Sequence, residues 1–342
     1  MGMGNYLPSP FLAYPLNWPT IKGFSMNDLI DSQLALVPMI PVAPFGFKSG
    51  FIGIIGRPNV GKSTLMNQLV GQKIAITSPV AQTTRNRLRG ILTTPQAQLI
   101  FVDTPGIHKP HHELGKVLVQ NAQRAINSVD VVLFVVDSSV PLGGGDRYIG
   151  ELLENTKTPI ILGLNKCDQQ PEQYQTLDET YQELATSRNW PLIKFSALQG
   201  TGLAELQSQL TEKLTPGPYY YPPDLVTDQP ERFIMGELIR EQILLLTRQE
   251  VPHSVAVVIE KVEESPTLTK VYGAINVERD SQKGIIIGKN GSMLKTIGTS
   301  AREAMQKLIE GEVYLKLFVK VEPKWRQSKE LLSQFGYRNE DS

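Results

Sequence analysis

The sequence predicts an α/β domain with a mostly parallel sheet and helices on both faces, followed by a smaller α+β domain. Two observations support this fold class. Short apolar runs alternate with helical stretches over residues 49–215, and a second series of helices and strands occupies residues 232–322. Between them, residues 216–231 are rich in Pro and Tyr, which is typical of a stiff linker. A length of 342 residues fits about two domains.

The elements of the first domain are predicted from short apolar runs bounded by turn residues. Because Leu88–Leu92 and Gln98–Val102 are joined by a short turn, we expect them to form a hairpin. The other expected elements are strands at Phe51–Ile55, Val131–Val136, Ile160–Leu164 and Leu192–Phe195, and a helix at Thr64–Val70.

A glycine-rich loop lies between the first strand and the first helix. Residues 56–63 read Gly-Arg-Pro-Asn-Val-Gly-Lys-Ser and match the P-loop pattern Gly-x-x-x-x-Gly-Lys-Ser. In this context the backbone N–H groups and the helix N-terminus point at polyphosphate oxygens. We expect Lys62 to reach the β- and γ-phosphates and Ser63 to ligate Mg²⁺. The residues expected to line the phosphate site are Gly56, Asn59, Val60, Gly61, Lys62, Ser63 and Thr64.

A second set of nucleotide-binding residues is expected around the strand that ends at Asp103. Asp103 suits a carboxylate that holds Mg²⁺ through water, and the Gly106 N–H can donate to the γ-phosphate. Thr104 and Pro105 lie between them and belong to the same site. The polar loop at 81–85 has two hydroxyl candidates for closing over the metal, of which we favour Thr84 over Thr83. The expected metal ligands are Ser63, Thr84 and Asp103.

The base is indicated by Asn165-Lys166-Cys167-Asp168, which follows an apolar strand. This places the motif at the carboxyl end of a strand, where open α/β sheets hold their ligands. The Asp168 carboxylate can accept hydrogen bonds from both N1–H and the 2-amino group of guanine, and adenine offers neither donor there. The tripeptide Ser196-Ala197-Leu198 is expected to supply a backbone N–H to the guanine O6, with Ser196 and Ala197 as the binding residues. The predicted nucleotide is therefore GTP.

Together these motifs resemble the translation-factor-class GTPases, and three segments are similar to the Era family in particular. They are the loop at 56–63, the sequence Asp-Thr-Pro-Gly-Ile-His-Lys-Pro at 103–110, and the Pro/Tyr segment at 217–224 with its continuation to Phe233. Era proteins are GTPases joined to an RNA-binding KH domain. The resemblance runs from about Gly50 to the C-terminus and implies Mg²⁺-dependent hydrolysis of GTP to GDP and phosphate.

One departure from Ras-type proteins bears on catalysis. Ile107 stands where those proteins have a water-orienting Gln, so we expect slow intrinsic turnover, since a Gln-bearing GTPase reaches only about 10⁻⁴ per second unaided. Some relatives of Era hold K⁺ with the P-loop Asn, which implies that role for Asn59. His108 is interpreted as a solvent-facing loop residue rather than a base. The expected catalytic residues are Lys62, Thr84 and Asn59.

The second domain is expected to have the order α-β-β-α-α-β. A helix at Phe233–Leu246 precedes strands at Ser254–Val262 and Lys270–Glu278, and a strand at Tyr314–Val321 closes the domain. The turn Gly288-Lys289-Asn290-Gly291 joins the two later helices. This order and turn resemble a type II KH domain, which clamps about four nucleotides of single-stranded RNA. The expected RNA-binding residues are Gly288, Lys289, Asn290, Gly291, Lys283 and Lys295.

Composition limits the function classes. The 34 basic and 34 acidic residues give no global signal for nucleic acid, so an RNA site must be a local patch. The single Cys, Cys167, argues against disulfides and for a reducing cytosolic setting. No apolar run is long enough to predict a transmembrane helix. Residues 1–48, with seven prolines, are expected to be a mostly disordered extension, with a partner-binding tail as the alternative. The tail at 323–342 could pack on the KH domain, touch RNA or form a solvated helix.

By resemblance to Era, the expected function is a GTP-driven switch that binds small-subunit (16S) ribosomal RNA near its 3′ end and acts in small ribosomal subunit assembly. The expected partners are this RNA and the small subunit. We expect a cytoplasmic monomer, and the resemblance also implies peripheral contact with the inner face of the cell membrane. Two alternatives stay open: an RNA-binding scaffold that holds GTP without hydrolysing it, and a related GTPase of tRNA modification or large-subunit assembly.

Overall fold

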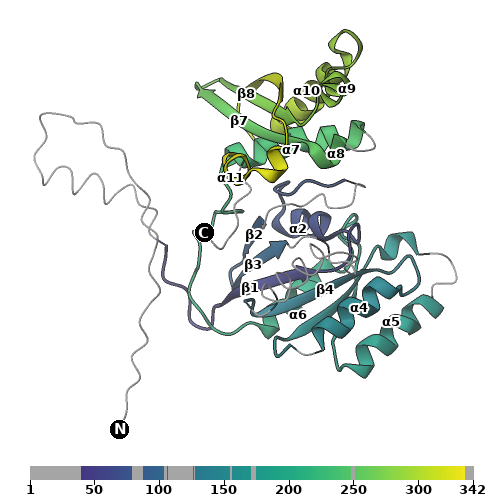
Figure 1. Cartoon of the computed structure of the whole chain (residues 1–342). Coiled ribbons are helices and arrows are strands. Elements are labelled where there is room, and N and C mark those ends of the chain that lie inside the picture. Colours follow the sequence, from purple (N-terminus) through teal and green to yellow (C-terminus); the bar gives the residue numbers. More distant parts are fainter. Residues whose placement is uncertain are drawn as a thin grey trace, which may run out of the picture. The chain divides into compact units, whose positions relative to one another are not determined.

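The computed structural model describes residues 40–78, 88–103, 106, 126, 128–154, 156–170, 175–247 and 251–335. Within them lie a six-stranded sheet flanked by helices and a second, three-stranded sheet (Figure 1). The larger sheet has the order β2-β3-β1-β4-β5-β6. Its strands are β1 (Lys48–Ile55), β2 (Leu88–Thr93), β3 (Ala97–Asp103), β4 (Val131–Asp137), β5 (Ile160–Asn165) and β6 (Leu192–Lys194).

The strand pairing confirms the predicted fold class. β2 pairs antiparallel with β3, as the short turn between them predicts, and the other pairs in this sheet are parallel. Because parallel strands end at the same edge, the residues at the carboxyl ends of β1, β3, β4 and β5 are brought together there. The chain reaches that edge at Gly56, Asp103, Asp137 and Asn165.

Helices cover both faces of the larger sheet, and each face has its own core. One core combines sheet residues with α2 (Lys62–Val70) and α6 (Leu203–Lys213). The other combines them with α4 (Gly144–Leu153) and α5 (Gln175–Ser187). Successive residues of β4 alternate between the two cores, with Leu133 in the first and Phe134 in the second. A strand buried on both faces reads as a continuous apolar run, which is why the sequence identified it.

The Pro/Tyr linker is anchored along the hairpin. The fully buried Gln98 on β3 accepts hydrogen bonds from Tyr220 N (2.8 Å) and Tyr221 N (3.0 Å), and its amide donates to Tyr221 O (2.9 Å). Further along, Thr227 Oγ1 donates to the carbonyl of Arg89 on β2 at 2.7 Å. The linker is therefore held by the edge of the sheet as well as stiffened by proline.

The second sheet has the order β7-β8-β9, with β7 antiparallel and β9 parallel to β8. The predicted α-β-β-α-α-β order is confirmed, with one short extra helix before the first strand. One apolar core joins the sheet to α7, α9 and α10. The elements are α7 (Glu231–Leu246), α8 (Val251–Ser254), β7 (Ala256–Glu264), β8 (Leu268–Val277), α9 (Asp280–Ile287), α10 (Ser292–Met305) and β9 (Glu312–Val321).

The first turn of the C-terminal tail packs on this second fold. Trp325 is 2% exposed, and its Nε1 donates to Ser254 O at 3.0 Å. Arg326 forms an ion pair with Glu278 at 2.5 Å. A short helix, α11 (Lys329–Gln334), follows. Of the alternatives for the tail, Trp325 therefore supports packing on the KH fold.

Two expectations are not settled by the described residues. The Pro-rich extension lies almost entirely outside them, since residues 1–39 are not described. The predicted domain boundaries stay a prediction.

Among the described helices, none combines the length and the apolar character that crossing a membrane requires.

Candidate nucleotide and RNA sites

The P-loop connects β1 to α2 in a tight curve. Gly61 has φ of +97°, a left-handed conformation that favours glycine. A Cβ at this position would lie 2.3 Å from Asn165 Nδ2, so a larger residue would push the base-recognition loop away. Asn59, with φ of +64°, is also left-handed and lies exposed at the outside of the loop. Glycine at position 61 is therefore required both by backbone conformation and by the neighbouring loop.

Lys62 lies inside this curve and is buried. Its ammonium donates to the carbonyls of Gly56 (3.1 Å) and Arg57 (2.9 Å), which orient it in the loop. Burial lowers the pKa of Lys62 to about 8, against the opposing charge of Asp103. A desolvated, oriented ammonium is suited to bind phosphate, because the anion supplies the charge partner that burial removes.

The two described candidates for Mg²⁺ meet beside Lys62. Ser63 Oγ donates to Asp103 Oδ2 at 2.9 Å, and the Asp103 side chain is fully buried. Ser63 lies in the first turn of α2, and Asp103 ends β3, which pairs with β1. A hydroxyl and a buried carboxylate in contact are oxygen ligands of the kind that Mg²⁺ takes. The donor set therefore fits the metal that the sequence predicts.

The loops that recognise the base are joined through Asn165. Its Nδ2 donates to Val60 O in the P-loop at 2.7 Å, and its Oδ1 accepts from Ala197 N at 2.9 Å. The neighbouring Ser196 N–H donates to Thr201 O. Two N–H groups considered for guanine O6 are thus engaged inside the protein here, and the predicted contact to O6 stays a prediction.

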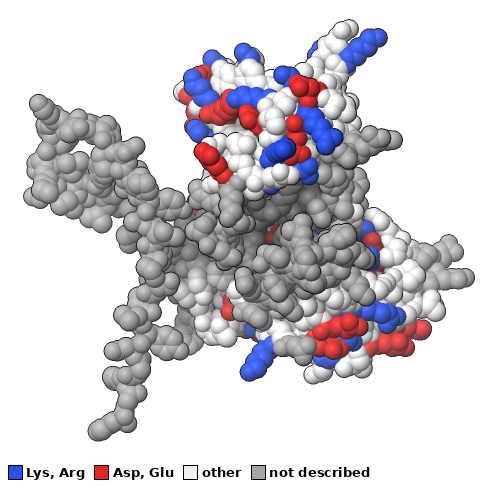
Figure 2. Space-filling model, viewed as in Figure 1, with Lys and Arg blue, Asp and Glu red and all other residues white. Residues whose placement is uncertain are grey.

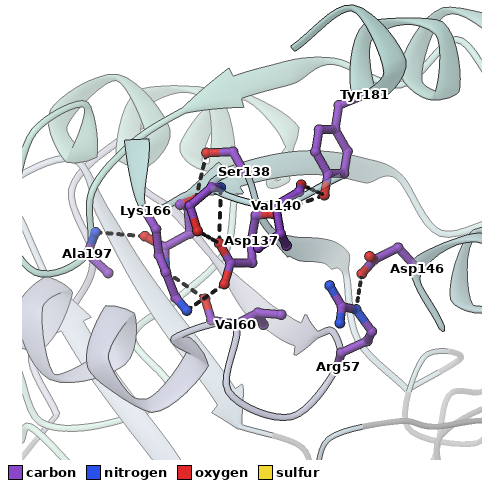
Figure 3. A network of polar contacts seen from close by, with 11 residues as sticks. Arg57, Val60, Asp137, Ser138, Val140, Asp146, Lys166, Tyr181 and Ala197 are labelled. Atoms are coloured by element: carbon purple, nitrogen blue, oxygen red, sulfur yellow. Dashed lines mark hydrogen bonds and ion pairs between the residues drawn. The ribbon is translucent and has the colours of Figure 1, made fainter. Parts of the chain in front are cut away.

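Asp168 has an oxygen that fits the guanine edge. Its Oδ1 atom is buried and makes no hydrogen bond to any described residue. Burying a carboxylate oxygen without a donor is costly, so the arrangement favours a ligand that brings N–H groups. The adjacent Lys166 is held by Asp137, with Nζ 2.5 Å from Oδ2, and this contact belongs to the network in Figure 3.

Several predicted site residues lie outside the described part of the chain. They are Thr84 and its alternative Thr83, Thr104 and Pro105, and the catalytic-loop residues Ile107 and His108. Gly106 is described, and a Cβ there would lie 2.7 Å from Pro58 N. Gly106 itself therefore lies directly against the P-loop.

The predicted RNA-binding turn joins α9 to α10. A Cβ at Gly288 would lie 2.7 Å from Met293 Cβ, and Gly291 is left-handed with φ of +77°. Between these glycines, Lys289 and Asn290 are exposed. The turn is therefore tight and presents one charged and one amide side chain between two glycines. A Gly-x-x-Gly loop of this kind lets the RNA backbone approach the protein closely.

The other two basic candidates flank the turn. Lys283 lies half-buried on α9, and Lys295 lies exposed on α10. On the visible face of this part of the chain, basic and acidic side chains are interspersed rather than separated (Figure 2). The described residues on this face therefore form no broad basic surface, and the predicted local patch at the turn stays a prediction.

The segment before the polar loop contacts the first helix of the second fold. Glu241 on α7, with a side chain only 2% exposed, accepts from Lys73 Nζ at 2.5 Å and from Thr77 N at 2.8 Å. After the polar loop, Arg89 on β2 forms an ion pair with Asp228 of the linker at 2.7 Å. The upstream flank of the polar loop is therefore bonded to α7 of the KH fold, and the downstream flank to the linker that leads into it.

Sequence reasoning missed several residues that build the site. Asp137 at the end of β4, Asp146 in α4 and Glu241 in α7 belong to no recognised motif. The position of Asp137 after a buried strand was an available signal, because other site residues share that position. For Asp146 and Glu241 there was none, since their partners lie far away in the sequence.

Comparisons with known proteins agree with this geometry. A family model described as 50S ribosome-binding GTPase matches residues 51–166, and one described as KH domain matches residues 250–326. GTPase Era of Rippkaea orientalis is 77% identical over 309 residues, which cover 90% of this chain and 98% of that protein. GTPase Era of a Nostoc species is 73% identical over 321 residues, covering 94% and 99%.

Two solved structures are similar over both folds. One is Era in complex with MgGDPNP and nucleotides 1506–1542 of 16S ribosomal RNA, at 37% identity and a TM-score of 0.79. The other is a variant of Aquifex aeolicus Era bound to GDP and AlF₄⁻, at 38% identity and a TM-score of 0.79. Each alignment covers 86% of this chain and 100% of the other.

Proposed function

Because the chain belongs to the Era family of GTPases, and so binds GTP and hydrolyses it to GDP and phosphate, we propose that its nucleotide state controls RNA binding by the KH fold. We propose that the RNA lies near the 3′ end of 16S ribosomal RNA and that the process is small ribosomal subunit assembly. The relative solved with a fragment of 16S ribosomal RNA supports this choice of RNA.

The proposed roles in the nucleotide site follow from its geometry. Lys62 binds the β- and γ-phosphates, and Ser63 and Asp103 hold Mg²⁺ with Thr84 as the further ligand. The contact between Ser63 and the buried carboxylate of Asp103 supports these two as one metal site. Bound Mg²⁺ would neutralise charge on the phosphates, and Asp168 selects guanine through its buried oxygen.

The hydrolytic step is proposed to be slow without a partner. Ile107 can neither orient water nor accept a proton, so the chain's own contribution is electrostatic, from Lys62 and the loop N–H groups. We propose that Asn59 holds a K⁺ ion, whose positive charge would add to that of Lys62. Turnover that is the same in K⁺ and Na⁺ would contradict the proposal, and Asn59→Ala should abolish a K⁺ preference.

The observation that carries the switch is that the upstream flank of the polar loop is bonded to α7 of the KH fold, and the downstream flank to the linker that leads into it. Glu241 is a buried carboxylate whose charge is compensated by Lys73 and by the Thr77 N–H upstream of the polar loop. Buried charged hydrogen bonds are directional and costly to break. A movement of the loop on GTP binding would therefore be resisted or transmitted at α7, which is what coupling between the two sites requires.

The proposal is tested by RNA affinity in two nucleotide states. The whole chain is titrated with a short RNA that copies the 16S 3′ end, once with a GTP analogue and once with GDP. A scrambled RNA of the same length and composition serves as the control. We expect an affinity ratio of about tenfold or more between the two states, which corresponds to a coupling of about 1.4 kcal/mol. Equal affinities would contradict the switch, and absent binding in both states would contradict the choice of RNA.

The non-hydrolysing scaffold is not retained, since the chain belongs to a family of GTPases. A role in tRNA modification or large-subunit assembly is disfavoured by the KH fold. A monomeric, cytoplasmic protein stays a proposal, supported in its cytosolic setting by the single Cys, and peripheral contact at the inner membrane face is proposed from the resemblance.

A further inference from the structure

We infer that Asp146 is a positioning residue for phosphate binding, because through Arg57 it holds the P-loop carbonyl that orients Lys62. The inference rests on the proposed phosphate role of Lys62. It extends the site to a carboxylate on α4 that lies outside the recognised motifs.

The contact between Asp146 and Arg57 is partly buried and charge-assisted. Asp146 is fully buried, and its Oδ1 accepts from Arg57 Nε at 2.7 Å, as the dashed line in Figure 3 marks. Its Oδ2 accepts from Gly143 N at 3.3 Å, which fixes the carboxylate at the start of the helix. Burial lowers the pKa of Arg57, but the hydrogen bond and charge of Asp146 more than offset this, so the pKa is raised overall. The pair is thus a fixed ionic contact.

Arg57 passes this constraint to Lys62 through its backbone. The carbonyl of Arg57 accepts from Lys62 Nζ at 2.9 Å, and the carbonyl of Gly56 accepts at 3.1 Å. If the Arg57 side chain were released, its backbone could shift and move one of the acceptors that orient the ammonium. Charge-assisted hydrogen bonds depend strongly on such geometry.

The connection from β4 to α4, which precedes the helix that carries Asp146, is held by α5. The hydroxyl of the buried Tyr181 on α5 lies 3.0 Å from Asp137 O at the end of β4 and 3.1 Å from Val140 O in the loop that leads to α4. Figure 3 shows this contact beside the one between Asp146 and Arg57. The support for the P-loop therefore reaches back to α5.

Two adjacent glycines provide a matched pair of probes. A Cβ at Gly145 would lie 2.6 Å from Arg57 Cδ, so the arginine stem crosses directly over the α4 backbone. A Cβ at Gly144 would meet no atom within 4 Å. Both residues are in the first turn of α4, so Ala has the same helix propensity at each. Gly145→Ala should displace Arg57 while leaving Asp146 in place, and Gly144→Ala should not.

The test measures affinity for guanosine, GDP and a GTP analogue in the wild type, Asp146→Asn, Gly145→Ala and Gly144→Ala, with Arg57→Ala, its double variant with Asp146→Asn, and Lys62→Ala measured beside them. We expect Asp146→Asn and Gly145→Ala to weaken GDP and GTP-analogue binding by about tenfold. Guanosine affinity should stay unchanged, because guanosine lacks phosphates, and Gly144→Ala should behave as the wild type. In Arg57→Ala, adding Asp146→Asn should cause no further loss.

Three results separate this inference from its premise. If Lys62→Ala leaves GDP affinity unchanged, the phosphate role of Lys62 is wrong and the inference falls with it. If Lys62→Ala weakens GDP binding but Asp146→Asn and Gly145→Ala do not, positioning by Asp146 is overturned while the site stands. An equal loss for guanosine and GDP would show general loosening of the fold and would also overturn it. Should Asp146→Asn fail to fold, Gly145→Ala against Gly144→Ala decides alone.

Discussion

Replacing Asp168 by Asn should reverse the base preference of the nucleotide site. The Oδ1 atom of Asp168 is buried without a donor among the described residues, and guanine would bring two N–H groups to this carboxylate. Asn keeps one acceptor for N1–H but presents an NH₂ group to the 2-amino group, so two donors oppose each other. Xanthine has a carbonyl at that position and should accept from the new NH₂ group.

The magnitude follows from the bonds exchanged. A hydrogen bond to a charged group contributes roughly 1.5–3 kcal/mol, and the donor–donor contact adds a desolvation cost of about 1–3 kcal/mol. The sum predicts GDP binding weakened by roughly 10²- to 10⁴-fold. The loops themselves should persist, because Asn165 is held by Val60 and Ala197 and not by Asp168.

The assay is competition of GDP and xanthosine diphosphate against a fluorescent nucleotide. Asp178→Asn is the matched control, since its carboxylate lies in the same fold but pairs with Lys194 at 2.6 Å. We expect the control to keep the preference for GDP. Wild-type affinity of Asp168→Asn for GDP would refute the assignment of Asp168 to the base. A loss of GDP affinity with no gain for xanthosine diphosphate would refute the proposed pairing geometry.

Four further outcomes are expected. Burial lowers the pKa of Lys62 from 10.5 to about 8 in the nucleotide-free protein, so between these pH values the unfolded chain binds more protons than the folded one. The contribution of Lys62 to the unfolding free energy therefore becomes more favourable as the pH rises. The advantage of Lys62→Met in unfolding free energy should therefore shrink between pH 7 and pH 10, and a constant difference would contradict this. Trp325→Ala should lower the unfolding free energy by about 3–5 kcal/mol in a denaturant titration, since the ring is buried and hydrogen-bonded; a loss below about 1 kcal/mol would argue against tail packing. Replacing Lys289 and Asn290 together by Asp should weaken RNA binding at least about tenfold without changing Tm, because both side chains are exposed; unchanged affinity would place the RNA elsewhere. Glu241→Gln should reduce the ratio of RNA affinities between the GTP and GDP states by removing the charge partner of Lys73, and an unchanged ratio would exclude this contact from the coupling.

The sequence predicted the elements whose signals are local. The run Val131–Val136 is apolar throughout because β4 is buried on both faces, so its pattern needs no knowledge of its neighbours. The P-loop was equally readable, since its glycines and its lysine are consecutive and lie between a strand and a helix. The boundaries moved by a few residues: β1 begins at Lys48 rather than Phe51, because pairing with β3 extends to Ala97.

Site residues that lie inside sequence motifs were predicted, and the residues outside the motifs that hold them in place were missed. Lys62, Ser63 and Asp103 came from the sequence, and the structure brings them together. The prediction that Ser196 and Ala197 present backbone N–H groups to the base did not foresee that Asn165 takes the Ala197 N–H. Competition between a ligand and a neighbouring side chain for one donor is decided by distances, which spacing along the chain does not contain.

By itself, the sequence determined the fold class, the nucleotide and the KH turn, because each is encoded by residues close together along the chain. Only the tertiary structure decided that Asp146 holds Arg57 from 89 positions away, and that Glu241 bonds to Thr77 from 164 positions away. The physical reason is that such pairs form only after the strand order and helix packing have brought distant segments together. No local propensity distinguishes these two carboxylates from the other Asp and Glu residues of the chain, so only their burial and the distances in the folded protein select them.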